Sequence, residues 1–177
     1  MRIASEQPID WTALAVELGT LGERGERGGG QVACDALNAL LGSEQLRLAV
    51  AHYLDLRPGF ELVRSVLSLL RPPVAMHECY RVYRESDDIE RRRAAVELLR
   101  VVADVTTLPW VEEFLDDPDE GIQAWGAGVL DCLVVRDLVD GREHTVRTLV
   151  ARLESHASWS VRQCASVIRG MLEDRGP

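Results

Sequence analysis

The 177-residue chain contains no lysine, so arginine supplies all 20 of its fixed positive side-chain charges. It also lacks any run of about 18 apolar residues, the length that a membrane-spanning helix needs. No basic segment followed by an apolar stretch stands near its start, so neither membrane insertion nor export is predicted. Aromatic residues make up only 5% of the chain, while apolar residues make up 46%. This composition predicts one globular domain over residues 1–177.

Basic residues are fewer than acidic ones, 20 against 29, which gives a net charge of −9. Nucleic-acid affinity comes largely from cations that displace counterions at phosphates. The charge therefore opposes nonspecific binding to DNA or RNA. Arginine without lysine indicates GC-rich coding and a bacterial origin.

The four cysteines lack the Cys-x-x-Cys spacing of a zinc site. They are Cys34, Cys79, Cys132 and Cys164, about 30 or more residues apart. We expect them to be reduced and mostly buried, behaving as small apolar residues. Reduced cysteines predict a cytoplasmic location.

Strand signals are nearly absent, because apolar residues recur at three- and four-residue spacing rather than in alternation. The chain therefore predicts an all-α fold. Capping residues, glycines and prolines divide it into about ten helices, at about 10–21, 31–41, 44–56, 58–70, 73–85, 89–103, 107–115, 117–135, one following Gly141, and 158–173. The glycine-rich segment 22–30 is predicted to be a flexible loop. Helices this short do not stand alone in water and must pack together.

A small residue recurs on every second predicted helix, which indicates an internal repeat. The small residues are Ala36, Ser65, Ala95, Gly126 and Ala165, at intervals of 29, 30, 31 and 39. Four residues later stand Leu40, Leu69, Leu99, Leu130 and, breaking the pattern, Arg169. A small residue lets helices approach closely, and the leucine one turn later fills the space beside it. In the last three repeats a turn residue is followed four residues later by a long polar one: Asp88 by Arg92, Asp119 by Gln123, and Ser158 by Arg162.

Three segments carry the clearest repeat. They are residues 87–99, 117–130 and 158–168, with the sequences DDIERRRAAVELL, DPDEGIQAWGAGVL and SWSVRQCASVI. These segments resemble the second helices of HEAT repeats; the match is good over about 86–174, fair over 43–85 and poor before that. The resemblance implies a right-handed α-solenoid of about five stacked HEAT-like helix pairs, with the second helix of each pair on the concave side. It implies an architecture rather than an activity.

Two enzyme classes share this kind of fold. HEAT-like hydroxylases bind iron through several His-Glu pairs, and this chain has one, His77-Glu78. HEAT-like DNA glycosylases combine tryptophans and an acidic residue with a basic concave groove. Here arginines and acids are mixed on the predicted concave face: Arg92, Arg93, Arg100, Arg162 and Arg169 with Glu90, Glu97, Asp131 and Glu173. No phosphate-binding loop or nucleophile motif is present. We therefore expect no catalytic residues, no metal and no cofactor.

Six carboxylates are concentrated around one predicted turn between helices. They are Glu112, Glu113, Asp116, Asp117, Asp119 and Glu120, called the acidic edge below. One interpretation is local, because acids at helix starts accept hydrogen bonds from free N–H groups and stabilise by roughly 0.5–1 kcal/mol each. The other is that the acidic edge binds a basic partner, since complementary charge accelerates encounter. The two interpretations are compatible.

Tryptophans stand out in a chain this poor in aromatics. Trp110, Trp125 and Trp159 all lie near predicted helix starts. Core filling is one interpretation of their position. The other is that Trp110 and Trp159 anchor an interface beside the acidic edge, as tryptophan is enriched among residues that dominate binding energy.

The sequence thus predicts a non-catalytic module that binds a basic protein partner, and neither nucleic acid nor a membrane. Small acidic bacterial HEAT-like proteins include neutralisers of protein toxins, so the resemblance implies an immunity-type role. The alternative is a scaffold or adaptor that holds several partners with modest affinity. Reversal of Asp116, Asp117 and Asp119 to arginine is expected to abolish binding without unfolding the chain.

Overall fold

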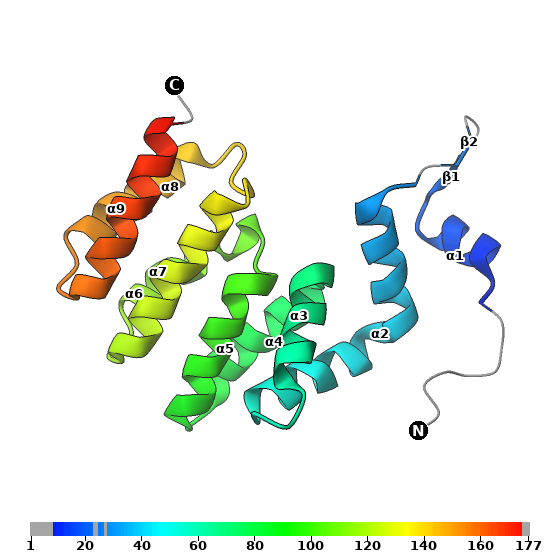
Figure 1. Ribbon diagram of the computed structural model, residues 1–177, viewed down its shortest axis with the longest axis horizontal. Helices are drawn as coiled ribbons and strands as arrows, with labels where there is room; N and C mark the ends of the chain where they lie inside the picture. The colour runs from blue at the N-terminus through cyan, green and yellow to red at the C-terminus, as the bar shows by residue number, and fades with distance from the viewer. Residues whose placement is uncertain (1–8, 23–24, 27, 175–177) are drawn as a thin grey trace.

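The computed structural model describes residues 9–22, 25–26 and 28–174. Within them the protein is all-helical apart from one minimal two-stranded ladder, which confirms the prediction of an all-α fold (Figure 1). The helices are α1 (Trp11–Glu17), α2 (Gly30–Leu54), α3 (Phe60–Leu70), α4 (Pro73–Glu85), α5 (Ile89–Val102), α6 (Leu108–Leu115), α7 (Glu120–Val135), α8 (Glu143–Glu154) and α9 (Trp159–Asp174). A 3-10 turn covers Val105–Thr107, and strand β1 (Leu21–Gly22) pairs antiparallel with β2 (Gly25–Glu26).

Helices α4 and α5 begin at the predicted residues, whereas α7 begins at Glu120, three residues after the predicted start at 117, with Asp119 as its cap. Asp88 Oδ1 accepts a hydrogen bond from the Glu90 amide (2.9 Å), and Asp119 Oδ1 accepts one from the Ile122 amide (3.0 Å). Pro73 opens α4. The first N–H groups of a helix have no partner within it, so an acid that accepts from them, or a proline that lacks one, fixes the start.

The N-terminal part agrees with the prediction at Gly42 and differs from it nearer the start of the chain. The predicted helices 31–41 and 44–56 are the two halves of α2, separated by a kink where Gly42 leaves helical geometry (φ 73°, ψ 157°). Such a positive φ favours glycine. Helix α1 ends at Glu17 rather than near residue 21, and Gly19 then takes φ 63°. The predicted loop 22–30 contains part of the β1–β2 ladder and the first residue of α2, while residues 23, 24 and 27 lie outside the described residues.

From α4 onward the helices pack in a repeating order. Helix α4 packs on α5, α6 on α7, and α8 on α9, while α5 packs on α7 and α7 on α9. Figure 1 shows α5, α7 and α9 as a row of neighbouring helices, with α1 at the opposite end of the molecule from α9. One continuous hydrophobic core runs through this stack, from Leu46 to Ile168. Burying the apolar faces of such short helices is what stabilises them.

The small residue and the leucine of the predicted repeat are buried in the C-terminal helices, whereas the leucine is exposed in the first two repeats. Ala95, Gly126 and Ala165 are buried, as are Leu99 and Leu130, none of them with more than 9% of its surface exposed. Gly126 marks the closest approach, because a Cβ atom added there would lie 2.4 Å from Phe114 Cβ on α6. In the two N-terminal repeats the equivalent leucines are exposed.

This close approach gives a stability test. We expect Gly126→Ala to lower the free energy of unfolding by about 1–3 kcal/mol, because the new methyl group overlaps Phe114 and the packed core has to shift. Gly170→Ala on α9 is the matched control, because nothing lies within 4 Å of a Cβ atom there. Its only effect is the helix propensity gained, a stabilisation of about 0.5–1 kcal/mol. Urea unfolding measures both; equal effects of the two changes would contradict the close packing.

Candidate functional site

Most carboxylates of the acidic edge are held by side chains of neighbouring helices. The edge spans the end of α6, the turn 116–119 and the start of α7. Glu112, Asp116 and Glu120 are exposed, Glu113 and Asp119 are half-buried, and Asp117 is buried with 5% of its surface accessible. The six predicted binding residues therefore have different environments.

Asp117 has a structural role. Its Oδ2 atom accepts hydrogen bonds from Tyr83 Oη on α4 (3.2 Å) and from the Arg92 guanidinium on α5, and its Oδ1 accepts from the Asp119 amide (3.0 Å). Burial and the neighbouring Asp117 carboxylate raise the pKa of Tyr83 to about 12. A carboxylate enclosed in this way has no surface left for a partner. The expectation that Asp117 belongs to an accessible binding ridge is corrected accordingly.

Asp119 is also occupied within the chain. Besides capping α7, it forms a two-point contact with Arg93 of α5, from Nε to Oδ1 (2.9 Å) and from Nη2 to Oδ2 (2.6 Å). This parallel geometry is the strongest form of an arginine–carboxylate pair. The Arg93 hydrogen bonds lower the pKa of Asp119 to about 2 from its ordinary 3.8.

Glu113 and Trp110 belong to one aromatic cluster against α4. Tyr80 Oη donates to Glu113 Oε2 (2.5 Å), and Arg84 pairs with the other carboxylate oxygen. The Tyr80 ring stacks on Trp110 with a centroid distance of 4.0 Å and an interplanar angle of 8°. His77 meets the same indole edge-on at 5.8 Å. Trp110 is therefore largely used in packing α6 onto α4, as the core-filling interpretation predicts.

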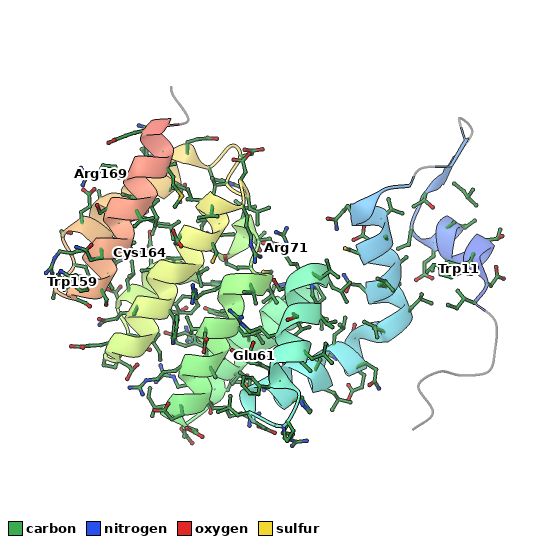
Figure 2. The ribbon with its side chains drawn as sticks, viewed as in Figure 1. Trp11, Glu61, Arg71, Trp159, Cys164 and Arg169 are labelled. Carbon is green, nitrogen blue, oxygen red and sulfur yellow. The ribbon has the colours of Figure 1, made fainter. Side chains whose placement is uncertain are left out.

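The accessible remainder of the site consists of Glu112, Asp116, Glu120 and Trp159, called the open surface below. Glu112 and Glu120 form no side-chain hydrogen bond or ion pair within the part of the chain that the structure describes. Asp116 pairs with Arg152 of α8, but its side chain remains 69% exposed. Trp159 is 68% exposed, and Figure 2 shows it at the outer edge of the molecule, at the start of α9.

A histidine brings Trp159 towards the acidic edge. His156, in the turn before α9, lies with Nε2 3.3 Å from the carbonyl oxygen of Leu115, at the end of α6. A carbonyl only accepts, so Nε2 is the donor, while Nδ1 accepts from the Ser158 amide (3.1 Å). The turns 116–119 and 155–158 therefore lie side by side. This contact places the exposed indole and the exposed carboxylates at the same end of the helix pairs.

At the recurring polar position of the predicted repeat, each side chain donates a hydrogen bond to a backbone carbonyl in the turn before its own helix or, for Arg92, near the end of the preceding helix. Arg92 Nε donates to the Tyr83 carbonyl (3.1 Å), Gln123 Nε2 to the Asp117 carbonyl (2.8 Å), and Arg162 Nη1 to the His156 carbonyl (2.6 Å). The sequence pattern marked these positions without indicating their role.

The arginines that occupy the acidic edge were missed by sequence reasoning. A signal for them existed, because opposite charges one repeat apart form ion pairs. Glu113 pairs with Arg84 over 29 residues, Asp116 with Arg152 over 36, and Asp55 with Arg91 over 36. These separations are close to the intervals of the predicted repeat, whereas the pairs of Asp117 with Arg92 and of Asp119 with Arg93 span only 25 and 26 residues.

The face formed by α5, α7 and α9 carries a second polar cluster. The Arg100 guanidinium lies 4.9 Å above the Trp125 ring, so this third tryptophan is covered by a cation. Burial raises the pKa of Asp131, and Arg100 opposes that rise. Burial also raises the pKa of Cys164 to about 12, and its thiol donates to the Ala127 carbonyl (3.3 Å). A thiol held in its protonated form is a poor nucleophile.

Metal-binding geometry is not found at His77-Glu78. Glu78 forms a two-point contact with Arg81 (2.6 and 3.1 Å), and these hydrogen bonds lower its pKa. Among the described residues, no three His, Cys, Asp or Glu side chains are grouped so that they would hold a metal ion. Over the same residues, no helix is both long enough and apolar enough to cross a membrane.

Comparisons with protein-family models, with curated protein sequences and with solved structures found no significant match. The resemblance to HEAT repeats therefore rests on the residues of this chain alone.

The Asp119–Arg93 contact predicts a pH dependence of stability. An aspartate whose pKa is lowered on folding stabilises the native state above pH 4, and this contribution is lost as the pH falls through 2. Solvent reaches Arg93, so we expect about 1 kcal/mol rather than the value of the full pKa shift. Asp119→Asn keeps an acceptable helix cap while removing the charge.

Urea unfolding of Asp119→Asn and of the native chain, at several pH values, checks this expectation. The two free energies should differ by about 1 kcal/mol at pH 6 and converge near pH 2. Glu112→Gln serves as the control and should follow the native chain throughout. A constant difference between Asp119→Asn and the native chain at all pH values would show that the charge is irrelevant.

The burial of Asp117 reverses the earlier expectation for charge reversal. Asp117→Arg leaves Arg92 without its carboxylate and adds a second cation, so we expect a loss of about 3–5 kcal/mol or failure to fold. Glu112→Arg, at an exposed position, should change the free energy of unfolding by less than about 0.5 kcal/mol. Thermal and urea unfolding of both variants compare them directly. A stable Asp117→Arg protein would show that folding does not need this carboxylate, and Asp117 would again be a candidate for partner binding.

Proposed function

We propose that this chain is a non-catalytic protein-interaction module whose helices form a right-handed α-solenoid of about five HEAT-like pairs. The packing order supports this, because each pair from α4 to α9 contacts its neighbours along the chain. The equivalent hydrogen bonds that Arg92, Gln123 and Arg162 donate to backbone carbonyls support a true structural repeat. Repeats of this kind bury one continuous core and leave extended surfaces for binding.

The partner-binding surface in this proposal is the open surface, rather than the whole acidic edge. The observation that carries it is the 68% exposure of Trp159 at the same end of the helix pairs as Glu112 and Glu120, which form no side-chain hydrogen bond or ion pair among the described residues. Trp is enriched among the residues that dominate interface energies, because it buries a large rigid surface. Exposed carboxylates at the same end of the helix pairs attract cations and repel acidic proteins. A basic protein fits both features.

More specifically, we propose that the protein binds and neutralises a basic protein toxin in the bacterial cytoplasm. The net charge of −9 favours rapid encounter with such a partner, and reduces competition from nucleic acid. The internal arginine pairs leave Glu112 and Glu120 as the carboxylates that a basic partner would neutralise first.

Capture of partners from a lysate of the source organism, followed by calorimetry with the purified partner, tests this surface. We expect Glu112→Arg/Glu120→Arg to weaken binding at least 10-fold at physiological salt, because attraction becomes repulsion. Trp159→Ala should weaken it about 30-fold, as expected for removal of roughly 2 kcal/mol of interface energy. Added salt should weaken the native complex and leave the reversed variant less affected.

The control is Glu44→Arg/Asp140→Arg, which reverses two exposed acids on α2 and in the turn before α8. Both double variants carry the same net charge, −9 + 4 = −5. The control should bind within about twofold of the native chain, because long-range charge alone contributes little at physiological salt. Equal weakening by the two double variants would remove the open surface from the proposal. Several partners of modest affinity, instead of one, would favour the scaffold role.

A further inference from the structure

Exposed apolar side chains are concentrated in the N-terminal part of the described chain, on α1, α2 and α3 and in the segments that flank them. Of the fifteen large apolar side chains exposed in the described residues, twelve lie between residues 9 and 69. They are Ile9, Trp11, Val16, Leu21, Leu37, Leu40, Leu41, Leu48, Leu56, Leu62, Val66 and Leu69. Monomeric proteins rarely expose so many apolar groups in one region unless the region binds something.

Helix α3 presents one continuous apolar stripe to solvent. Leu62, Val66 and Leu69 follow one another at spacings of four and three, so they lie on one side of the helix. Their exposed fractions are 70%, 41% and 72%. In the repeat register, Val66 and Leu69 correspond to Val96 and Leu99 of α5, both of which are fully buried. Helix α3 therefore has the type of face that α5 buries against neighbouring helices.

The first half of α2, residues 31–41, exposes a second apolar face. Leu37, Leu40 and Leu41 are between 41% and 46% exposed. Within one chain, this half of α2 makes polar contacts with the last turn of α3. Cys34 Sγ lies 3.6 Å from the carbonyl oxygen of Leu69, and Asn38 Nδ2 lies 3.3 Å from the carbonyl oxygen of Leu70. No described residue from 21 to 45 is buried. A helix of this length is marginal without packing.

We propose that these two faces bind each other between two copies of the chain, with residues 31–41 of each copy lying on α3 of the other. The register supports this pairing, because residues 31–41 carry the small-residue and leucine pair of the repeat, Ala36 and Leu40. That pair matches Ser65 and Leu69 on α3. A two-fold axis allows both contacts to form at once, so each copy buries both of its faces.

The chemistry of the two faces favours a second copy over the basic partner assigned to the open surface. The stripe on α3 and the stripe on residues 31–41 consist of leucine and valine, and contain no charge. The native dimer also has further apolar surface to bury on α1, where Trp11 and Val16 are 61% and 63% exposed. Figure 2 shows Trp11 at the end of the molecule farthest from Trp159.

Sedimentation equilibrium of the full chain, from about 1 to 100 μM, tests the proposal. The native chain should sediment as a dimer, at twice its 19.7 kDa. Leu69→Glu and Leu40→Arg should each raise the dissociation constant at least 100-fold, since each places two charges in the apolar contacts of a dimer. Both positions are exposed in the single chain, so circular dichroism should show unchanged helicity. Val167→Glu on α9, 53% exposed, is the control and should stay dimeric.

Mixing the two monomeric variants identifies which faces meet. In a mixed dimer, the arginine introduced at position 40 of one copy faces the glutamate introduced at position 69 of the other, and the second contact keeps both native leucines. The mixture of Leu69→Glu with Leu40→Arg should therefore re-form a dimer that neither variant forms alone. A native chain that is monomeric at about 100 μM, or a mixture that stays monomeric, overturns the proposal. A Leu69→Glu protein that remains dimeric overturns it as well.

Discussion

The buried carboxylate of Asp117 is the contact on which the arrangement of the central helices depends. It joins the hydroxyl of Tyr83 on α4 to the guanidinium of Arg92 on α5, and it closes the turn that leads into α7. Both ionic groups are mostly removed from water, so neither tolerates loss of the other. Because Arg92 also binds the Tyr83 carbonyl, this one cluster sets where α4 ends, where α5 begins and how α6 leads into α7. Hydrophobic packing is not directional, so the apolar core stabilises the helices without fixing how they are aligned. The hydrogen bonds of the polar cluster fix that alignment.

Local chemistry made the helices predictable from the sequence. The starts of α5 and α7 follow from Asp88 and Asp119, and the break in α2 follows from Gly42, since each effect involves residues a few positions apart. The role of the acidic edge was not predictable in the same way. Its carboxylates are paired with arginines 25 to 36 residues away. The local sequence of the acidic residues is the same whether or not distant arginines neutralise their charges. The structure was needed to separate Glu112 and Glu120 from Asp117.

The repeat register shows the same limit for apolar residues. Periodicity predicts that a helix has an apolar face, because that property belongs to the helix alone. Whether the face is covered depends on a neighbouring helix. Leu69 and Leu99 occupy equivalent positions on α3 and α5, yet the first is 72% exposed and the second is fully buried. The sequence pattern therefore located the packed face of α5 and α7, and it could not indicate that the equivalent leucines of α2 and α3 are uncovered within one chain.

One register position distinguishes the two ends of the proposed stack. In α9 this position is Arg169, an exposed residue that pairs with Glu154 of α8, so the outermost helix pair presents charge to water. In the two N-terminal repeats the same position is still leucine, Leu40 and Leu69, and both side chains are exposed. Stacked repeats require a polar outer face where the stack ends. The substitution of arginine for leucine satisfies that requirement at the α9 end only. The N-terminal end keeps the residues of an interior repeat, which is the physical reason to expect that another helix covers it.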